Sequence, residues 1–339
     1  MTSYFSTFTT GFSEVVSQAL LENIKDIHID LLTDGLVIYK TATRPNEIKN
    51  LKYFNNSFLL LKHYHNVDER FLYKISKSML SDDNIFSDLK NHFPHRTRRF
   101  RIRAAIKNQH VSLDKNIVKK LEHKITSLQS NFVVDRSLVD LEILITIRSE
   151  GFALVGVQFT GRPNYEKTLS KGELYPELAY ILCLISEPKK DDIFLDPFAG
   201  HGSITAQRLF FPHKEIHAGE IDNDLLTKLR KKFNVKVIVD SVDALSLKAF
   251  DDSSINKIVT DPPWGLFDTN KDIPNFYALM LKQFHRVLKA DGIIVVLTAQ
   301  KELIENLLEK YPSRLILENK YTTLVSGKKA GVYKIRKIS

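Results

Sequence analysis

The sequence predicts an α/β protein: a doubly wound parallel sheet in the second half, preceded by an α+β region. Three observations predict this class. From residue 175 onward short apolar strands alternate with helices, a glycine-rich turn directly follows the first of these strands, and the residues before 165 form shorter mixed groups of strands and helices. Alternating strands and helices are typical of a parallel sheet, which binds its ligands at the carboxyl ends of its strands.

Length and composition are those of a globular protein. The chain has 339 residues, which at roughly 150 residues per domain predicts two domains. Its 43% of hydrophobic and 26% of charged residues exclude disorder as the main state. The single cysteine, Cys183, excludes a disulfide framework and a cysteine-rich zinc site, and it fits a reducing, cytoplasmic compartment. No run of about 18 apolar residues predicts a membrane span, and the first ten residues do not resemble a secretory signal.

Basic residues are in excess, with 49 Lys and Arg against 40 Asp and Glu, a net charge of +9. Residues 1–165 hold 23 basic and 17 acidic residues, a net of +6, and the remaining residues hold 26 and 23, a net of +3. The excess favours a polyanionic partner, and the first half carries most of it.

The first 50 residues are expected to form a small mixed unit. Apolar residues recur at helical spacing over Phe12–Ile24, and two short strands are expected at His28–Leu32 and Gly35–Thr41. The next segment, 51–163, starts with the apolar run Ser57–Leu61.

The centre of that segment is strongly basic. Residues 91–107 contain six Lys or Arg and no acid, and arginines alternate with apolar residues from Arg99 to Ala104. This alternation predicts a strand with one basic face. An amphipathic helix is expected at Lys115–Leu128, followed by strands at Leu141–Ile147 and Phe152–Phe159.

The second half follows the alternating pattern throughout. The expected elements are a helix at Tyr175–Ile185, a strand at Ile193–Leu195, a helix at Ile204–Phe210, a strand at Ile216–Ile221, a helix at Asn223–Phe233, strands at Val235–Asp240 and Ile255–Thr260, a helix at Pro274–Leu288, a strand at Gly292–Thr298 and a helix at Lys301–Lys310.

The strongest motif is the glycine turn at 196–203, DPFAGHGS, directly after a strand. Gly200 and Gly202 let the backbone approach a ligand closely, and the following helix presents free N–H groups and the positive end of its dipole. Asp196 is placed to hold an ammonium group of that ligand. The alternative is a plain tight turn between strand and helix.

Two further carboxylates follow the next strands. Glu220 ends its strand, where a carboxylate accepts the ribose hydroxyls of an adenosine. A dinucleotide fingerprint would need glycine at Thr205, which disfavours a nicotinamide dehydrogenase. Asp243, followed by Ala244, is expected to accept an adenine amino group or to be an exposed loop carboxylate. Asp222 is expected to be solvated or to cap the next helix.

The fourth motif is Asp261-Pro262-Pro263-Trp264, directly after an apolar strand. Two prolines fix a rigid turn. The Asp261 side chain and the Pro262 carbonyl are acceptors that could hold a planar amino group by its two hydrogens. Trp264 offers a face for stacking an extruded base. The alternative is an Asp-Pro turn covered by a core tryptophan.

In this order and spacing, DPFAGHGS, GEID, VDA and DPPWG resemble class I S-adenosylmethionine-dependent methyltransferases that modify exocyclic amino groups. Gly172–Ala179 resembles the helix that these enzymes place against the cofactor. The basic strand, the helix after it and the segment 140–159 resemble a THUMP domain, an RNA-binding module. Together they resemble the THUMP-containing RNA guanine methyltransferases, which act on tRNA or rRNA.

The resemblance implies three domains: a ferredoxin-like unit at 1–50, a THUMP-like RNA-binding domain at 51–163 and a Rossmann-like methyltransferase domain at 164–339. It implies S-adenosylmethionine as cofactor and RNA, above all tRNA, as partner. Residues implied to contact the cofactor are Tyr175, Asp196, Phe198, Ala199, Gly200, Gly202, Ser203, Glu220, Asp243 and Ala244. Residues implied in catalysis are Asp261, Pro262, Pro263 and Trp264. Residues expected to grip RNA phosphates are Arg96, Arg98, Arg99, Arg101 and Arg103.

The resemblance leaves the target base open. The family often has Asn at the position of Asp261 and Tyr or Phe at that of Trp264. Both changes keep the acceptor and the aromatic face, but DPPW also occurs in DNA adenine 6-amino methyltransferases. The same motifs would suit an rRNA guanine methyltransferase, and a non-catalytic RNA-binding protein could retain this fold. The oligomeric state is left open.

Several residues are expected to have other roles. Histidines 63, 65, 92 and 95 are dispersed and lack acidic or cysteine partners, so no metal site is expected. Cys183 is expected in the core. His201, in the glycine turn, is expected to have a structural role rather than to contact the ligand directly. The basic tail at 327–337 is expected either to touch RNA or to form a solvated last strand.

Overall fold

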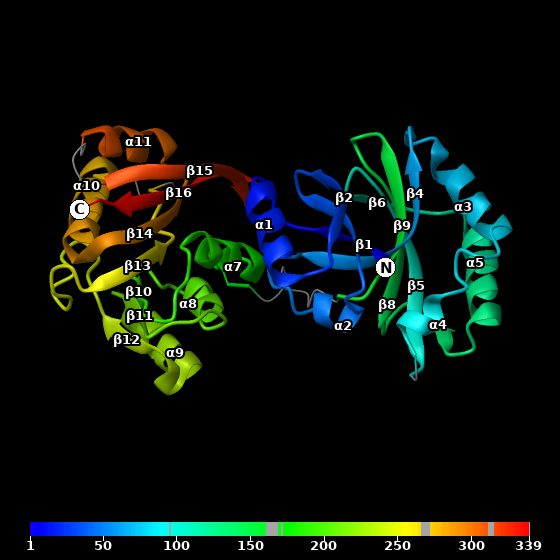
Figure 1. Cartoon of the computed structure of the whole chain (residues 1–339), viewed down its shortest axis with the longest axis horizontal. Helices are drawn as coiled ribbons and strands as arrows, with labels where there is room; N and C mark the ends of the chain where they lie inside the picture. The colour runs from blue at the N-terminus through cyan, green and yellow to red at the C-terminus, as the bar shows by residue number, and fades with distance from the viewer. Residues whose placement is uncertain (95, 161–168, 171, 266–271, 311–314, 339) are drawn as a thin grey trace. The chain divides into compact units, whose positions relative to one another are not determined.

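A computed structural model describes residues 1–94, 96–160, 169–170, 172–265, 272–310 and 315–338 (Figure 1). The chain divides into two compact units, one formed by Met1–Phe8 and Ser17–Pro163, the other by Thr9–Val16 and Asn164–Ser339. The main division coincides with the predicted start of the methyltransferase domain. Within the described residues, no helix combines the length and the apolar character that crossing a membrane requires.

The first unit is built on one nine-stranded sheet with the order β2-β3-β1-β4-β9-β8-β5-β6, and β7 pairs with β5. Its strands are β1 (Thr2–Thr7), β2 (His28–Thr33), β3 (Leu36–Thr41), β4 (Asn56–His65), β5 (Arg98–Ile106), β6 (Gln109–Val111), β7 (Phe132–Val134), β8 (Leu141–Ile147) and β9 (Phe152–Gln158). Its helices are α1 (Ser13–Asn23), whose first residues belong to the second unit, α2 (Pro45–Ile48), α3 (Phe71–Ser81), α4 (Leu89–His92) and α5 (Lys115–Leu128).

A separate unit at residues 1–50 is not observed. β1, which the sequence analysis missed, pairs antiparallel with both β3 and β4, so the hydrogen-bonded sheet runs across residue 50 without a break. The stacked rings of Phe5 and Phe58, with centroids 4.3 Å apart, join the two predicted domains in one core. The expected strands and the expected helix at Lys115–Leu128 are confirmed within a few residues of their predicted ends.

Two helices of the first unit, α3 and α5, pack against each other and against the sheet (Figure 1). Asp114 caps α5, because its side chain accepts hydrogen bonds from the backbone N–H groups of Asn116 and Ile117. Ile117, Leu121 and Ile125 form the buried side of α5, and its lysines lie on the other side. The helix therefore has one apolar and one basic face.

The second unit has a seven-stranded sheet with the order β12-β11-β10-β13-β14-β16-β15. Its elements are α7 (Pro176–Ile185), β10 (Ile193–Asp196), α8 (Ser203–Arg208), β11 (Glu215–Glu220), α9 (Asn223–Phe233), a 3-10 turn η1 (Asn234–Lys236), β12 (Ile238–Ser241), β13 (Ile255–Thr260), α10 (Ile273–Val287), β14 (Leu288–Thr298), α11 (Lys301–Lys310), β15 (Leu315–Val325) and β16 (Lys328–Lys337). The predicted parallel sheet is confirmed for β10 to β14.

The sheet departs from the prediction at two places. The strand expected at Val235–Asp240 begins only at Ile238, because Asn234 has a positive φ of 51° and a short 3-10 turn follows it. At the other edge, β15 and β16 form an antiparallel hairpin, and β16 inserts between β14 and β15. The sequence analysis missed β15.

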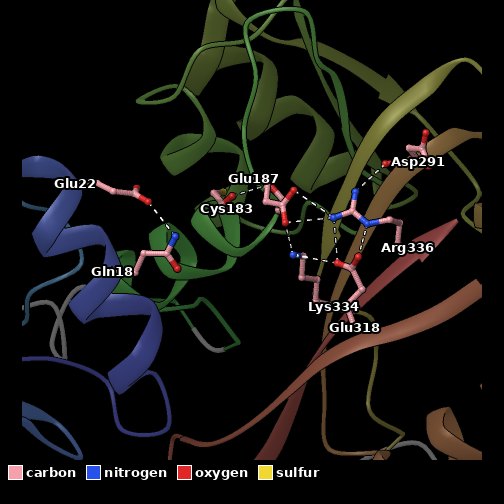
Figure 2. Close-up of polar contacts among 9 residues, drawn as sticks. Gln18, Glu22, Cys183, Glu187, Asp291, Glu318, Lys334 and Arg336 are labelled. Atoms are coloured by element: carbon pink, nitrogen blue, oxygen red, sulfur yellow. Dashed lines mark hydrogen bonds and ion pairs between the residues drawn. The ribbon is translucent and has the colours of Figure 1, made fainter. Parts of the chain in front are cut away.

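The basic tail at 327–337 is a last strand, as one of the two expectations had it, but most of it is buried or partly buried and only its start, at Gly327 and Lys329, is exposed. It forms β16, in which Val332 and Ile335 are fully buried. Figure 2 shows that Lys334 and Arg336 both contact Glu187, at the end of α7, and Glu318, on β15. These ion pairs neutralise the charges of Lys334 and Arg336 within the second unit. Cys183, also drawn in Figure 2, is fully buried, as predicted.

Candidate functional site

The candidate site lies where the direction of strand order reverses in the second sheet. The chain proceeds from β10 to β11 and β12 on one side and then from β13 to β14 on the other, so the switch point lies between β10 and β13. In doubly wound sheets ligands bind beyond the carboxyl ends of the strands at this point. β10 ends at Asp196, the first residue of the glycine motif, and β13 ends at Thr260, directly before Asp261.

The glycine loop after β10 requires its glycines. Gly202 has a φ of +78° and is the N-cap residue of α8. A Cβ atom at this position would lie 2.7 Å from the ring of Phe233, so no larger residue fits without rearrangement. Gly200 also has a positive φ, of 53°, but the nearest atom to its Cβ position is the Phe198 carbonyl oxygen, 4.0 Å away. A ligand can therefore approach the backbone at Gly200.

Glu220 connects the end of β11 to this loop. One carboxylate oxygen accepts a hydrogen bond from the Gly200 N–H at 2.9 Å, and the other accepts from the N–H groups of Ile221 and Asp222 at 2.8 and 3.0 Å. An ionised carboxylate has about four acceptor positions. Three are occupied by the backbone, so in this rotamer Glu220 has room for one ribose hydroxyl rather than the two expected.

Asp196 is buried, with 1% of its surface exposed. Its carboxylate accepts a hydrogen bond from the Thr260 hydroxyl at 2.9 Å, which links the ends of β10 and β13. Burial raises the pKa of Asp196 to about 7, and the charges of Asp261 and Glu220 raise it as well. The predicted ammonium contact stays a prediction; the observed role of Asp196 is to join the two strand ends.

Asp261 is the first residue after β13 and is partly buried. Burial raises its pKa to about 7, and a hydrogen bond from the Trp264 side chain opposes this rise. In that bond the indole Nε1–H donates to Asp261 Oδ1 at 2.8 Å. Trp264 was predicted only to stack on a base, so the sequence analysis missed its role in orienting Asp261.

Two residues far along the chain hold the Asp-Pro-Pro-Trp turn. The Tyr277 hydroxyl on α10 donates to the Pro263 carbonyl at 3.2 Å and lies 2.7 Å from the Thr298 hydroxyl. The Gln300 side chain donates to the Trp264 carbonyl at 2.5 Å. No donor among the described residues bonds to the Pro262 carbonyl, which leaves it available as an acceptor. No sequence motif marks Tyr277 or Gln300, since their partners are backbone carbonyls.

The remaining predicted cofactor residues lie in the loops after β10 and β12, at the start of α8, and at the start of α7. Asp243 is exposed and uses one oxygen to accept the Leu245 N–H at 2.9 Å. Ala199 and Ala244 are buried, and the Phe198 ring lies 5.7 Å from that of Phe276. Ser203 begins α8, and Tyr175 is the N-cap residue of α7.

Two residues in or beside the glycine loop have backbone or capping contacts, and a ligand role for the His201 side chain stays untested. Asp222 caps α9 by accepting the Leu225 N–H at 2.9 Å, as predicted. His201 contributes its carbonyl to Lys232, at 2.7 Å. Over the residues that the structure describes, no three His, Cys, Asp or Glu side chains gather as a metal-binding group. His95, one of the four dispersed histidines, lies outside the described residues.

Four of the five arginines predicted to bind RNA, all except Arg98, have acidic partners in the first unit. Arg99 donates to Asp140 through Nε at 3.1 Å and through its backbone N–H at 2.9 Å, and Arg96 contacts the same carboxylate at 3.1 Å. The hydrogen bonds from Arg99 lower the pKa of Asp140 to about 2. Asp140 therefore remains ionised and paired.

Glu142 pairs with the next two arginines of β5, Arg101 and Arg103. It directly faces Arg101 in the parallel pairing of β5 with β8 and lies 2.6 Å from its guanidinium and 3.3 Å from that of Arg103. Arg98 is partly buried, and its Nε has no partner among the described residues. The basic face of β5 is thus largely neutralised by its neighbouring strand.

Comparison with known proteins fits this geometry. The family described as "RMKL-like, methyltransferase domain" matches residues 163–323. A relative from Methanothermococcus thermolithotrophicus, named probable tRNA (guanine(10)-N2)-dimethyltransferase, is 31% identical over 147 residues, which are 40% of this chain and 88% of the relative. The chain belongs to this methyltransferase family. The match begins at residue 163, so the THUMP resemblance of the first unit stays a prediction.

A second relative is the tRNA (guanine(6)-N2)-methyltransferase of Thermus thermophilus, 27% identical over 185 residues, or 52% of this chain. The chain spans only 55% of that relative's length. The crystal structure of TrmN from Thermus thermophilus superposes with a TM-score of 0.78 at 19% identity and covers 100% of both chains. This likeness shows that the whole chain, the first unit included, shares that fold.

Proposed function

We propose that this protein transfers a methyl group from S-adenosylmethionine to the 2-amino group of a guanosine in tRNA. The carrying observation is the pair of acceptors at the end of β13, the Asp261 carboxylate and the Pro262 carbonyl, next to the glycine loop of β10. The names of both relatives support guanine N2 and tRNA as the target. The single cysteine supports a cytoplasmic location.

The carboxylates at the switch point fit this cofactor. Asp261 and Glu220 raise the pKa of Asp196 in addition to burial, so these acids repel one another when ionised. A ligand with a sulfonium and an ammonium group offsets that repulsion. Glu220 keeps one acceptor position for a ribose hydroxyl, and Asp243 can accept the adenine amino group. The open backbone at Gly200 leaves room for close approach.

When bound, the cofactor supplies a methyl group on a positively charged sulfur, which is already a strong electrophile. The protein therefore has to position the acceptor amine and exclude water. Asp261 and the Pro262 carbonyl accept the two amino hydrogens, which directs the nitrogen lone pair away from the ring plane. Asp261 would stabilise the positive charge that the amine nitrogen gains when it accepts the methyl group, and the amine proton would pass to solvent afterwards.

The direct test is incubation with methyl-labelled S-adenosylmethionine and an unmodified tRNA transcript, followed by nucleoside analysis by mass spectrometry. We expect labelled N2-methylguanosine. Mapping its position is informative, because the two relatives are named for positions 6 and 10. Labelled 6-methyladenosine in duplex DNA in place of tRNA, or no transfer to any nucleic acid, would overturn the proposal.

Asp261→Ala tests the residue assigned to the amine. We expect turnover to be lost while cofactor affinity, measured by isothermal titration, stays within a few fold of the wild type. The reason is that Asp261 faces the acceptor amine in the proposed arrangement rather than the cofactor. A variant that no longer binds the cofactor would refute this role.

A further inference from the structure

Because the arginines of β5 are paired with carboxylates, a polyanion is expected to bind another surface of the first unit. The unit carries much of the chain's positive charge, yet Asp140 and Glu142 bind four of its arginines. A phosphate at β5 would have to displace carboxylates that are already paired and whose side chains are only 13% and 12% exposed. An exchange of one anion for another adds little binding free energy, so cations without acidic partners are better suited to a polyanion.

Such cations line a groove of about 590 Å³ between the end of α3 and the exposed side of α5. We call it the α5 groove; it is lined by Leu80, Asp83, Lys119, Lys120, His123, Lys124, Ser127 and Leu128. Lys119, Lys120 and His123 are exposed. Among the described residues, neither Lys119 nor Lys120 has an acidic partner.

The other two charged side chains of the groove, Lys124 and Asp83, make contacts within the first unit. Lys124 donates to the carbonyls of Leu80 and Asp82, at 2.8 and 2.9 Å, and pairs with Asp83 at 3.1 Å. It therefore holds the carboxyl end of α3 and fixes the groove's shape. Asp83 is the one acid in the lining, and Lys124 offsets its charge. Lys119 and Lys120 remain as uncompensated charges on a helix whose opposite face is anchored in the core.

We propose that the α5 groove, through Lys119 and Lys120, is the surface that binds the phosphate backbone of the RNA substrate. The inference rests on the proposed function for the identity of that RNA. The groove combines features that suit a phosphate chain: a concave surface, lysines at two consecutive positions of α5, and the apolar side chains of Leu80 and Leu128 in its lining. Lysines that bind phosphates release condensed counterions, so each such contact makes binding more sensitive to salt.

The test compares tRNA binding by the wild type and the double variant Lys119→Glu, Lys120→Glu, measured by fluorescence anisotropy across a salt series. Glutamate is a good helix former, so α5 should persist, and circular dichroism checks this. We expect affinity at 0.15 M salt to fall by at least about tenfold. The slope of log affinity against log salt should decrease by about 2 for two lost phosphate contacts.

The matched control is Lys25→Glu, Lys49→Glu, which changes charge equally at two exposed lysines of the same unit outside the groove. It should change affinity by less than about threefold. A second comparison uses the double variant Arg99→Gln, Arg101→Gln, called the strand variant, which removes two of the paired arginines of β5. Equal losses in the groove variant and the control, or loss confined to the strand variant, would overturn the proposal.

Two further readouts separate this inference from the proposed function. If the wild type binds RNA through the groove but methylates no tRNA, the proposed function fails and the inference stands. If the wild type methylates tRNA and the groove variant keeps the wild-type KM for tRNA, the inference fails alone. Binding to phosphatidylserine vesicles that depends on Lys119 and Lys120, with tRNA binding unaffected, would assign the groove to a membrane surface and overturn it.

Discussion

Trp264→Phe tests the hydrogen bond that the indole Nε1–H donates to Asp261, 2.8 Å long in the structure. Phenylalanine keeps an aromatic face for the base but cannot donate. Burial raises the pKa of Asp261 to about 7, and the Trp264 bond holds it below the value that burial alone would give. The substitution should therefore raise the pKa of Asp261 further.

The size of the effect follows from the strength of the bond. A hydrogen bond to a charged group contributes about 1.5–3 kcal/mol, and one pKa unit corresponds to about 1.36 kcal/mol. Loss of the bond thus raises the pKa by about 1–2 units. If transfer needs the ionised carboxylate, activity is present above this pKa. At pH 7 the ionised fraction falls from about half to between about a tenth and a hundredth, so the rate falls about 5- to 50-fold.

The assay is single-turnover methyl transfer from pH 6 to 9.5 at saturating cofactor and RNA. The acid limb of the Trp264→Phe profile should shift to higher pH, and the variant should approach the wild-type rate near pH 9.5. Asp261→Asn keeps an acceptor oxygen without ionising, so its profile should lose the limb. An unshifted limb in Trp264→Phe, or a uniform loss at every pH, would refute the reasoning.

Three further substitutions probe the site's supports. Tyr277→Phe removes the donor to the Pro263 carbonyl and should cost about 1–2 kcal/mol of unfolding free energy and lower kcat, measured by urea denaturation and steady-state assays. Gly202→Ala should cost at least about 1–2 kcal/mol, because its φ is +78° and Phe233 is close; an unchanged denaturation midpoint would contradict this. Asp196 has a raised pKa, so folding loses stability as pH rises from about 4 to about 7. Asp196→Asn should lose less stability between pH 5 and pH 8 than the wild type.

The parts of the site that the sequence predicted are those whose signal is local. A strand, two glycines with positive φ and a helix follow one another within residues 193–208. The order of the strands then follows from alternation with helices, which places Asp196 and Asp261 at one switch point. Local patterns and sheet topology together were enough to predict that these two carboxylates lie at neighbouring strand ends.

The missed features depend on partners distant in the sequence. The window around Arg101 contains no acid, but Glu142 faces it from the next strand, 41 residues later. Tyr277 and Gln300 support the Asp-Pro-Pro-Trp turn by bonding to backbone carbonyls, which every residue type has, so no sequence pattern marks them. Ion pairing across strands and support of a backbone turn are therefore visible only once the register is known.

Residues 9–16 belong to the second unit, although 147 residues of the first unit separate them from its main body at Asn164. There Phe12 packs its ring 5.6 Å from that of Tyr321 on β15. The methyltransferase unit is consequently not a continuous stretch of chain. A protein that starts at residue 164 would expose the surface that Phe12 covers, and grafting the first unit onto another enzyme would carry a piece of this one with it. Exchange of either unit during evolution therefore requires the N-terminal segment to be matched to its new neighbour.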